Sequence, residues 1–285
     1  MNDSKLDPVR RAYAKQILAE AGVSDRSLEQ AFATLRREDF VGPGPWKLFR
    51  FPDGYYETPS DDPVYLYQDK LCALNSDKGL NNGQPSFLCF LISLGRLNPG
   101  DRVVHVGAGV GYYTAIMAEV VGNTGHVCAV EFEKDLASRA KNNLAGYCYV
   151  DVMQGDGSLI AFDPADVILV NAGATRPANV WLDALKDGGR LVLPLTVSFT
   201  TDDGHAMTKG AIFLIQRNGK YFSATWVSPT QIYPCMGLRD AESEAALVAG
   251  FKGGGWKNVR RLHRSDDIPK DECWVKTTDW SLTYH

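Results

Sequence analysis

The sequence predicts a doubly wound α/β fold built around a mostly parallel sheet. Three observations support this prediction. Short apolar runs alternate with helical stretches from residue 85 onward, a glycine-rich turn at 107–111 joins the first of these runs to a helix, and Asn218-Gly219 gives a strong hairpin signal near the end of the pattern. Continuous apolar runs of this kind are typical of parallel strands covered by helices on both faces.

The composition is that of an ordinary globular protein and excludes several classes of function. Hydrophobic residues make up 45% of the 285 residues and charged residues 22%. The net charge is −4, with no basic run typical of nucleic-acid binding, so we expect no nucleic-acid partner. No window approaches the ~18 apolar residues of a membrane span. We therefore expect no membrane segment.

The cysteines indicate a reduced compartment and no metal site. The six cysteines are widely spread, form no CxxC pair and have no histidine at zinc-site spacing. The N-terminus is polar and helical, unlike a signal peptide. These observations predict a cytoplasmic protein without a bound metal; the oligomeric state stays open.

The N-terminal part, residues 1–75, is expected to form a helical and irregular subdomain. Residues 7–21 carry apolar side chains at helical spacing. Ser24 and Asp25 offer N-cap oxygens for a second helix that ends near Arg37. The stretch 41–85 is rich in Pro, Gly, Asp and Tyr, which favours a long ordered loop with short strands.

Residues 76–235 are expected to form the core. The pattern predicts an opening helix at 86–96 and then alternating strands and helices. The expected strands are 103–106, 126–130, 149–153, 167–170 and 190–195, and the expected helices are 112–121, 133–144 and 178–185. A hairpin of 210–217 and 220–228 brings the sheet to seven strands. Residues 236–285, with a helix at 242–250 and several tryptophans, are expected to be a C-terminal extension packed on the core.

The glycine-rich turn indicates a nucleoside cofactor. Its predicted binding residues are Gly107, Ala108, Gly109 and Gly111, because glycines permit a tight turn and close approach of backbone N–H groups to a ligand. A dinucleotide fingerprint would have glycine where Tyr112 stands, so the spacing favours S-adenosylmethionine over a pyrophosphate. The alternative is a turn that needs glycine only for folding.

Two more strand ends carry predicted cofactor contacts. Glu131 ends the second strand, where its carboxylate can accept both ribose hydroxyls. Phe132 can pack on the adenine or fill a gap in the core. Gly155-Asp156-Gly157 ends the third strand, where Asp156 can accept from the adenine amino group or simply shape the turn. The carboxyl ends of parallel strands meet at one edge of a sheet, which favours the binding interpretation.

The chain resembles a divergent member of the protein-L-isoaspartate O-methyltransferase family over roughly residues 25–195. The resemblance implies a Rossmann-like fold, S-adenosylmethionine as cofactor, S-adenosyl-L-homocysteine as product, and a protein or peptide carboxylate as methyl acceptor. It rests on the stretches 107–115, 155–157, 185–194, 37–41 and 67–70.

The chain departs from the family pattern where the resemblance implies substrate contact. The family serine of the segment before the first core helix falls on Gly83, and Asn82 offers a replacement polar group. The run after the fourth strand also differs, at Asn171. We take Asn82, Gly83 and Asn171 as candidate substrate contacts and nominate no acid–base residue, because a carboxylate acceptor is already ionised near neutral pH.

Three functions fit these features. The first is a carboxyl O-methyltransferase acting on a protein or peptide, with isoaspartyl residues as one candidate. The second is a relative redirected to the carboxylate of a modified peptide or small molecule. The third is a protein that binds S-adenosylmethionine without catalysis.

Overall fold

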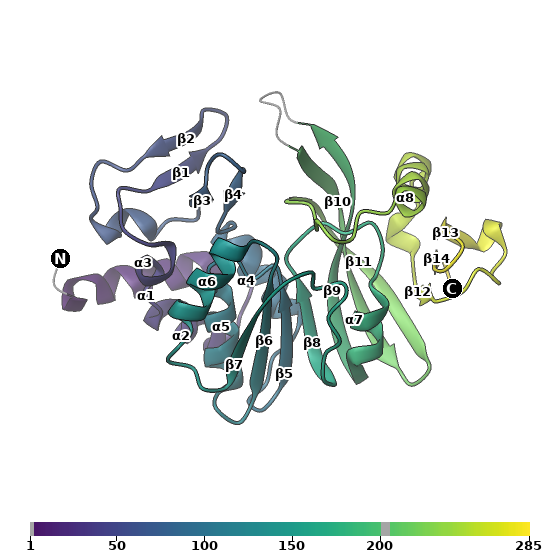
Figure 1. Cartoon of the computed structure of the whole chain (residues 1–285), viewed down its shortest axis with the longest axis horizontal. Coiled ribbons are helices and arrows are strands. Elements are labelled where there is room, and N and C mark those ends of the chain that lie inside the picture. The colour runs from purple at the N-terminus through teal and green to yellow at the C-terminus, as the bar shows by residue number, and fades with distance from the viewer. Residues whose placement is uncertain (1–2, 201–205) are drawn as a thin grey trace. The chain divides into compact units, whose positions relative to one another are not determined.

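The computed structural model describes residues 3–200 and 206–285, which form two compact units. The first unit contains residues 1–101 and 108–154, and the second contains residues 102–107 and 155–285. Figure 1 labels the helices and strands of both.

The first unit combines N-terminal helices and hairpins with part of the predicted core. Its helices are α1 (Asp3–Ala21), α2 (Arg26–Thr34), α3 (Arg37–Val41), α4 (Pro85–Leu94), α5 (Tyr112–Val121) and α6 (Lys134–Asn143). Its strands are β1 (Lys47–Arg50), β2 (Gly54–Glu57), β3 (Ala73–Asn75), β4 (Leu80–Asn81), β6 (His126–Glu131) and β7 (Val150–Gln154). The strands β1 and β2 pair antiparallel, as do β3 and β4, whereas β6 and β7 run parallel.

The predicted N-terminal helices are present. Asp25 is the N-cap of α2, and its carboxylate accepts hydrogen bonds from the backbone N–H groups of Ser27 and Leu28 at 2.8 and 3.1 Å. The second helix ends at Thr34 instead of near Arg37, because Leu35 and Arg36 adopt extended backbone angles before α3 begins. The predicted end of the second helix, near Arg37, was therefore wrong by about one turn.

A buried arginine fixes the irregular segment that follows. The Arg37 side chain is fully buried and donates hydrogen bonds to the carbonyl oxygens of Leu66, Gln68 and Lys70 at 2.8, 3.2 and 3.0 Å. These three carbonyls belong to the end of a 3₁₀ turn (Pro63–Leu66) and the loop after it. A planar guanidinium can satisfy several carbonyls at once, which holds this loop in one conformation.

The same loop caps the helix α4. Asp69 accepts the backbone N–H and the hydroxyl of Ser86 at 2.8 and 2.6 Å, and the Gln84 amide at 2.8 Å. Gln84 occupies the N-cap position of α4 but makes no capping bond with its side chain. The carboxylate of Asp69, seventeen residues before Ser86 in the sequence, therefore caps the N-terminus of α4. A negative charge is favourable at a helix N-terminus.

The helix α5 forms the interior of the first unit. All of its residues except Glu119 are buried, as its almost wholly apolar sequence requires. Its bounds, Tyr112–Val121, confirm the predicted helix 112–121. It begins directly after Gly111, which takes a left-handed conformation at the N-cap.

The second unit is an eight-stranded sheet with two helices. Its strands run in the order β13-β14-β12-β11-β10-β9-β8-β5. The bounds are β5 (Arg102–Val106), β8 (Ala165–Val170), β9 (Leu185–Thr200), β10 (Ala206–Asn218), β11 (Tyr221–Ile232), β12 (Arg261–His263), β13 (Cys273–Lys276) and β14 (Ser281–Thr283). The helices are α7 (Asn179–Ala184) and α8 (Ala241–Gly253), with 3₁₀ turns at Trp256–Asn258 and Lys270–Glu272.

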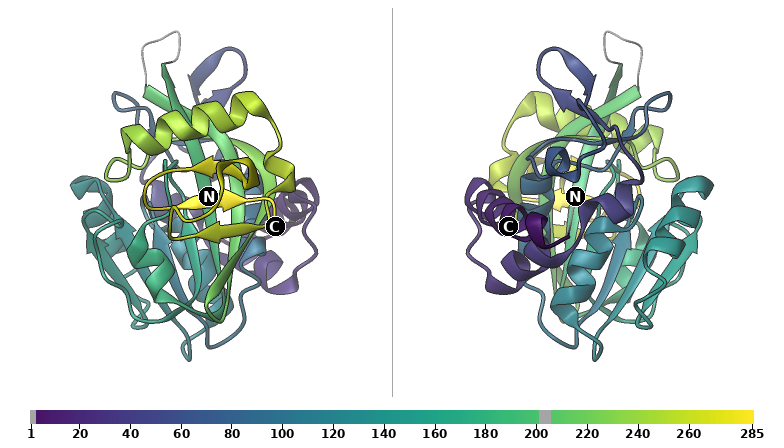
Figure 2. Two further views of the ribbon diagram at one scale, coloured as in Figure 1. Left: turned by 90° about the vertical axis from the view of Figure 1, so that its right-hand side faces the viewer. Right: turned by 90° about the vertical axis from the view of Figure 1, so that its left-hand side faces the viewer.

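The α/β class is confirmed, but the prediction of seven mostly parallel strands is wrong in detail. In the second unit only β5–β8 and β8–β9 pair in parallel, and the strands from β9 onward pair antiparallel. The hairpin at Asn218-Gly219 is present, with Gly219 at φ +61°. The additional strands come from the C-terminal segment, whose short strands β12, β14 and β13 continue the sheet beyond β11 (Figure 2).

His105 lies in the interior of β5. Its side chain is fully buried, and burial lowers the pKa of the imidazole to about 3. The ring is therefore neutral at physiological pH. None of the helices within residues 3–200 and 206–285 combines the length and hydropathy that crossing a bilayer requires.

Replacement of Arg37 should destabilise the protein strongly. We expect Arg37→Met to lower the free energy of unfolding by about 2–5 kcal/mol, because three carbonyl oxygens lose a donor, one of them fully buried. The matched control is the neighbouring Arg36→Met, whose side chain is 46% exposed and whose loss should cost under about 1 kcal/mol. Urea unfolding measures both variants, and equal effects would contradict the assigned role of Arg37.

Candidate cofactor site

The glycine-rich turn uses three glycines in the left-handed region, each for its own reason. Gly107, Gly109 and Gly111 have φ angles of +81°, +59° and +88°. In the first unit a Cβ on Gly111 would lie 2.8 Å from the Leu144 side chain, so packing excludes any larger residue there. In the second unit a Cβ on Gly107 would lie 3.0 Å from the carbonyl oxygen of Asn171.

Gly109 differs because its Cβ position is open. The nearest atom to that position is the Leu74 side chain at 3.8 Å. No clash therefore requires glycine at this position. The positive φ favours glycine, and the absence of a side chain leaves the space beside the backbone open. A glycine that leaves one side of a turn open is the feature that allows a ligand to approach the backbone.

Glu131 lies at the end of β6 and is tied directly to the turn. One carboxylate oxygen accepts the backbone N–H of Gly109 at 2.7 Å, and the other accepts that of Glu133 at 2.9 Å. The residue is 7% exposed. Burial raises the pKa of the Glu131 carboxyl above its ordinary value, although the N–H groups of Glu133 and Gly109 act in the opposite direction. Each oxygen keeps a further lone pair that can accept a hydroxyl.

The neighbours of Glu131 complete this part of the first unit. Phe132 is 46% exposed, and its carbonyl oxygen accepts the amide of Gln154 at 2.9 Å. The ring does not fill a core gap, which was one of the two roles considered for it. Ala108 is buried, and its N–H donates to the carbonyl of Val130 at 3.0 Å.

In the second unit, Gly155-Asp156-Gly157 forms a hydrogen-bonded turn. One oxygen of Asp156 accepts the backbone N–H and the hydroxyl of Ser158 at 2.9 and 2.8 Å, which is an Asx turn. Gly157 accepts the indole N–H of Trp181 at 2.8 Å. Gly155 takes φ +154°. Asp156 therefore shapes its own turn, and only one of its two oxygens is used for that purpose among the bonds of the described residues.

A segment that sequence reasoning missed lies against Asp156. A Cβ on Gly237 would fall 1.9 Å from the second carboxylate oxygen, so only glycine fits at that position. The hydroxyl of Ser158 also donates to the Gly237 carbonyl at 3.3 Å. The Pro-Cys-Met-Gly run that contains Gly237 carried no recognisable pattern, because this contact joins residues about eighty positions apart.

The three candidate substrate residues occupy different environments. Gly83 has φ +72°, donates its N–H to Asn81 at 2.8 Å, and would clash with Leu88 if it carried a Cβ. Asn171 donates its side-chain amide to the Gly107 carbonyl at 3.3 Å. Asn82 is 6% exposed, and its side-chain amide nitrogen has no hydrogen-bond partner within the described residues.

Sequence reasoning also missed two residues that position the Asn82 segment. Asp69 binds Gln84 and Ser86 as described above, and the hydroxyl of Tyr113 donates to the Gly83 carbonyl at 3.3 Å. Asp69 lies in the Tyr67–Lys70 stretch, whose resemblance to the family was the only signal available. Tyr113 follows the glycine-rich turn directly, but its partner is 30 positions away.

These residues fit the cofactor predicted from the sequence. The open side of Gly109 provides room for a ligand at the backbone, and the adjacent Glu131 carboxylate supplies acceptors that suit ribose hydroxyls. A strand followed by a glycine-rich turn and a helix, with an acidic residue ending the next strand, is typical of α/β proteins that bind nucleoside cofactors. With Tyr112 in place of the third glycine of a dinucleotide site, it fits the α/β methyltransferase class. A solved protein-L-isoaspartate O-methyltransferase shares this fold with a TM-score of 0.62 and 27% identity, over 79% of this chain and 65% of the other.

Comparisons of sequence identify the family. The family model for protein-L-isoaspartate(D-aspartate) O-methyltransferase matches residues 15–209. The protein-L-isoaspartate O-methyltransferase of Ignicoccus hospitalis is 32% identical over 195 residues, 67% of this chain and 83% of its own length. That of Thermotoga maritima is 31% identical over 191 residues, 65% of this chain but only 55% of its own length. The chain belongs to the protein-L-isoaspartate(D-aspartate) O-methyltransferase family.

Membership confirms the predicted resemblance, the enzyme class and the cofactor at the level of the family. A second solved structure, a protein-L-isoaspartate O-methyltransferase of Plasmodium falciparum in complex with S-adenosyl-L-homocysteine, has a TM-score of 0.60 at 14% identity. It shows likeness of fold alone.

The open side of Gly109 should be needed for cofactor binding. We expect Gly109→Ala to weaken S-adenosylmethionine binding about ten-fold or more, because the new methyl group occupies the space beside the backbone. The matched control is Gly122→Ala. Gly122 has a similar φ of +66° and nothing within 4 Å of its Cβ position. Both variants therefore carry the same backbone strain of about 1 kcal/mol. Calorimetric titration measures both variants, and equal affinities would contradict the role given to Gly109.

Proposed function

We propose that this protein is an S-adenosylmethionine-dependent carboxyl O-methyltransferase that acts on a protein or peptide carboxylate, with the isoaspartyl carboxylate as the first candidate. The observation that carries the proposal is the contact between Glu131 and Gly109 at an open glycine turn, in a chain that belongs to this family. The cytoplasmic location expected from the cysteines stays a prediction.

The proposed cofactor contacts are those expected from the sequence. The backbone of the glycine turn binds the amino-acid portion and Glu131 accepts the ribose hydroxyls, while Phe132 and Asp156 contact the adenine. The full set is Gly107, Ala108, Gly109, Gly111, Glu131, Phe132, Gly155, Asp156 and Gly157. The exposed ring of Phe132 supports the assignment of that residue.

Methyl transfer to a carboxylate requires the protein mainly to position the two reactants. When bound, S-adenosylmethionine would supply a methyl group on a positively charged sulfur. A carboxylate oxygen of the acceptor would bond to that methyl carbon as the carbon–sulfur bond breaks, which gives a methyl ester and the neutral thioether. An aspartyl-type carboxylate is ionised near pH 7, so no base has to remove a proton. The side chains therefore act by orienting the carboxylate and by excluding water.

Asn82 is the candidate best suited to orient that carboxylate. A buried donor without a partner costs roughly 1–3 kcal/mol, and such groups are retained mainly where function needs them. Gly83 cannot carry a hydroxyl, because its φ and its contact with Leu88 exclude a Cβ. The N–H of Gly83 is already bonded to Asn81, and the amide of Asn171 to Gly107. Among these three residues, Asn82 is thus the one whose side-chain amide keeps both N–H groups unused within the described residues.

Labelled methyl transfer tests the proposed function. We expect transfer from S-adenosylmethionine to an isoaspartyl peptide and none to the same peptide with a normal aspartyl residue. The product should be a base-labile ester, since a carboxylate oxygen receives the methyl group. Calorimetry in parallel establishes that the cofactor binds. Binding without transfer to the isoaspartyl peptide would overturn the isoaspartyl assignment, and absence of binding would overturn the proposed function.

Replacement of Asn82 should separate activity from stability. We expect Asn82→Ala to lower kcat/KM roughly ten-fold or more, because a hydrogen bond to the charged acceptor is lost. The free energy of unfolding should change by under about 1 kcal/mol. The isosteric Asn82→Asp should lose more activity, because it places a second carboxylate beside the substrate. Cofactor affinity should stay unchanged in both. If both variants keep full activity, Asn82 does not orient the substrate.

A further inference from the structure

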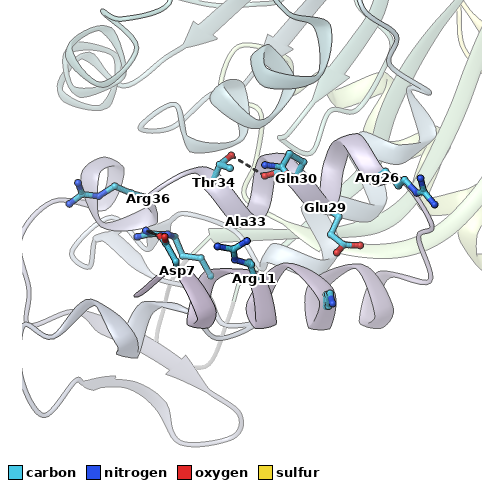
Figure 3. A pocket seen from close by; sticks show the side chains of 10 residues that line it. Asp7, Arg11, Arg26, Glu29, Gln30, Ala33, Thr34 and Arg36 are labelled. Carbon is cyan, nitrogen blue, oxygen red and sulfur yellow. Dashed lines mark hydrogen bonds and ion pairs between the residues drawn. The ribbon is translucent and has the colours of Figure 1, made fainter. Parts of the chain in front are cut away.

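A groove in the first unit lies between α1 and α2 and encloses about 800 Å³ (Figure 3). Its lining comes from α1, from α2 and from Arg36 just beyond α2. The hydroxyl of Thr34 donates to the Gln30 carbonyl at 2.9 Å along one side. The volume falls in the range typical of ligand-binding clefts. None of the residues with proposed catalytic or cofactor roles lines it.

The groove concentrates positive charge in a chain whose net charge is −4. Five arginine or lysine side chains line it, against two carboxylates. Arg11 and Lys15 are exposed and lie one helical turn apart on α1, and the exposed Arg26 begins α2. Like charges at this spacing repel each other, so an anionic partner would stabilise the surface.

One of the two carboxylates does not offset these exposed cations. Asp7 forms an ion pair with Arg10, whose side chain is buried and whose other guanidinium nitrogen lies 3.9 Å from Glu38. The charge of Asp7 is therefore already balanced by the buried guanidinium of Arg10. Glu29 remains as the single carboxylate facing Arg11, Lys15 and Arg26.

The lining residues indicate the kind of anion. They include no aromatic side chain, so the groove has no platform on which nucleic-acid bases could stack. The donors are guanidinium and ammonium groups, which match the geometry of carboxylates. These features fit an acidic peptide segment better than a nucleic acid.

We propose that the groove between α1 and α2 binds an acidic segment, rich in Asp and Glu, of the protein that the enzyme methylates. This inference rests on the proposed function, since it takes a protein as the substrate. Arg11, Lys15 and Arg26 supply the attraction. The groove selects protein substrates by the charge of a segment separate from the carboxylate that receives the methyl group.

Fluorescence anisotropy with a labelled deca-glutamate peptide tests the proposal on the full chain. We expect the triple variant Arg11→Glu, Lys15→Glu, Arg26→Glu to weaken binding roughly ten-fold or more. The matched control, Lys134→Glu, Lys141→Glu, Lys252→Glu, changes the net charge equally at exposed positions outside the groove. Binding in this control should remain within about two-fold of wild type.

Three outcomes would overturn the proposal. Equal losses in both triple variants would show a general charge effect without a site. Tighter binding of a labelled ten-nucleotide DNA strand, lost in the groove variant alone, would assign the groove to nucleic acid. Because the assay needs no turnover, its result stays separate from that of the methyl-transfer experiment. Methyl transfer to the wild-type substrate peptide, with no binding of deca-glutamate, would overturn this inference alone.

Discussion

The buried guanidinium of Arg37 is the constraint on which the candidate substrate segment depends. A charge without solvent must find fixed acceptors, and here the carbonyls of Leu66, Gln68 and Lys70 provide them. Their geometry leaves the intervening Asp69 in position to accept from Gln84 and Ser86 at the start of α4. An arginine in a five-residue helix thereby determines where a helix almost fifty residues later begins.

This arrangement explains how the segment before α4 keeps its shape although Gly83 has no side chain. Gly83 is held on one side by Asn81 and on the other by the hydroxyl of Tyr113. Since Tyr113 lies in the first turn of α5, just after the glycine turn, the candidate cofactor turn and the candidate substrate segment are connected within the first unit. A shift in either would strain the other. The amide of Asn82, which has no hydrogen-bond partner in the part of the chain that the structure describes, adjoins Gly83 in this segment.

The parts of the fold that the sequence predicted are those governed by neighbours along the chain. The bounds of α5 follow from an apolar run after Gly111, and the start of α2 follows from the capping carboxylate of Asp25. Long-range contacts left no such pattern. Arg37 resembles an exposed helix residue in sequence, and the contact of Gly237 with Asp156 joins distant loops. The short C-terminal strands were missed because long-range pairing, not periodicity, creates them: β12 pairs with β11, β14 with β12, and β13 with β14.

Glu131 shows why a predicted binding residue can also have a structural role. Its two oxygens first accept the backbone N–H groups of Gly109 and Glu133, so the carboxylate holds the glycine turn in shape before any ligand arrives. Burial alone would favour its neutral form, and the two N–H groups oppose that tendency. Such an acceptor is already oriented, so little ordering remains when a hydroxyl binds. The same carboxylate thus organises the turn and, in the proposed complex, would accept the ribose hydroxyls.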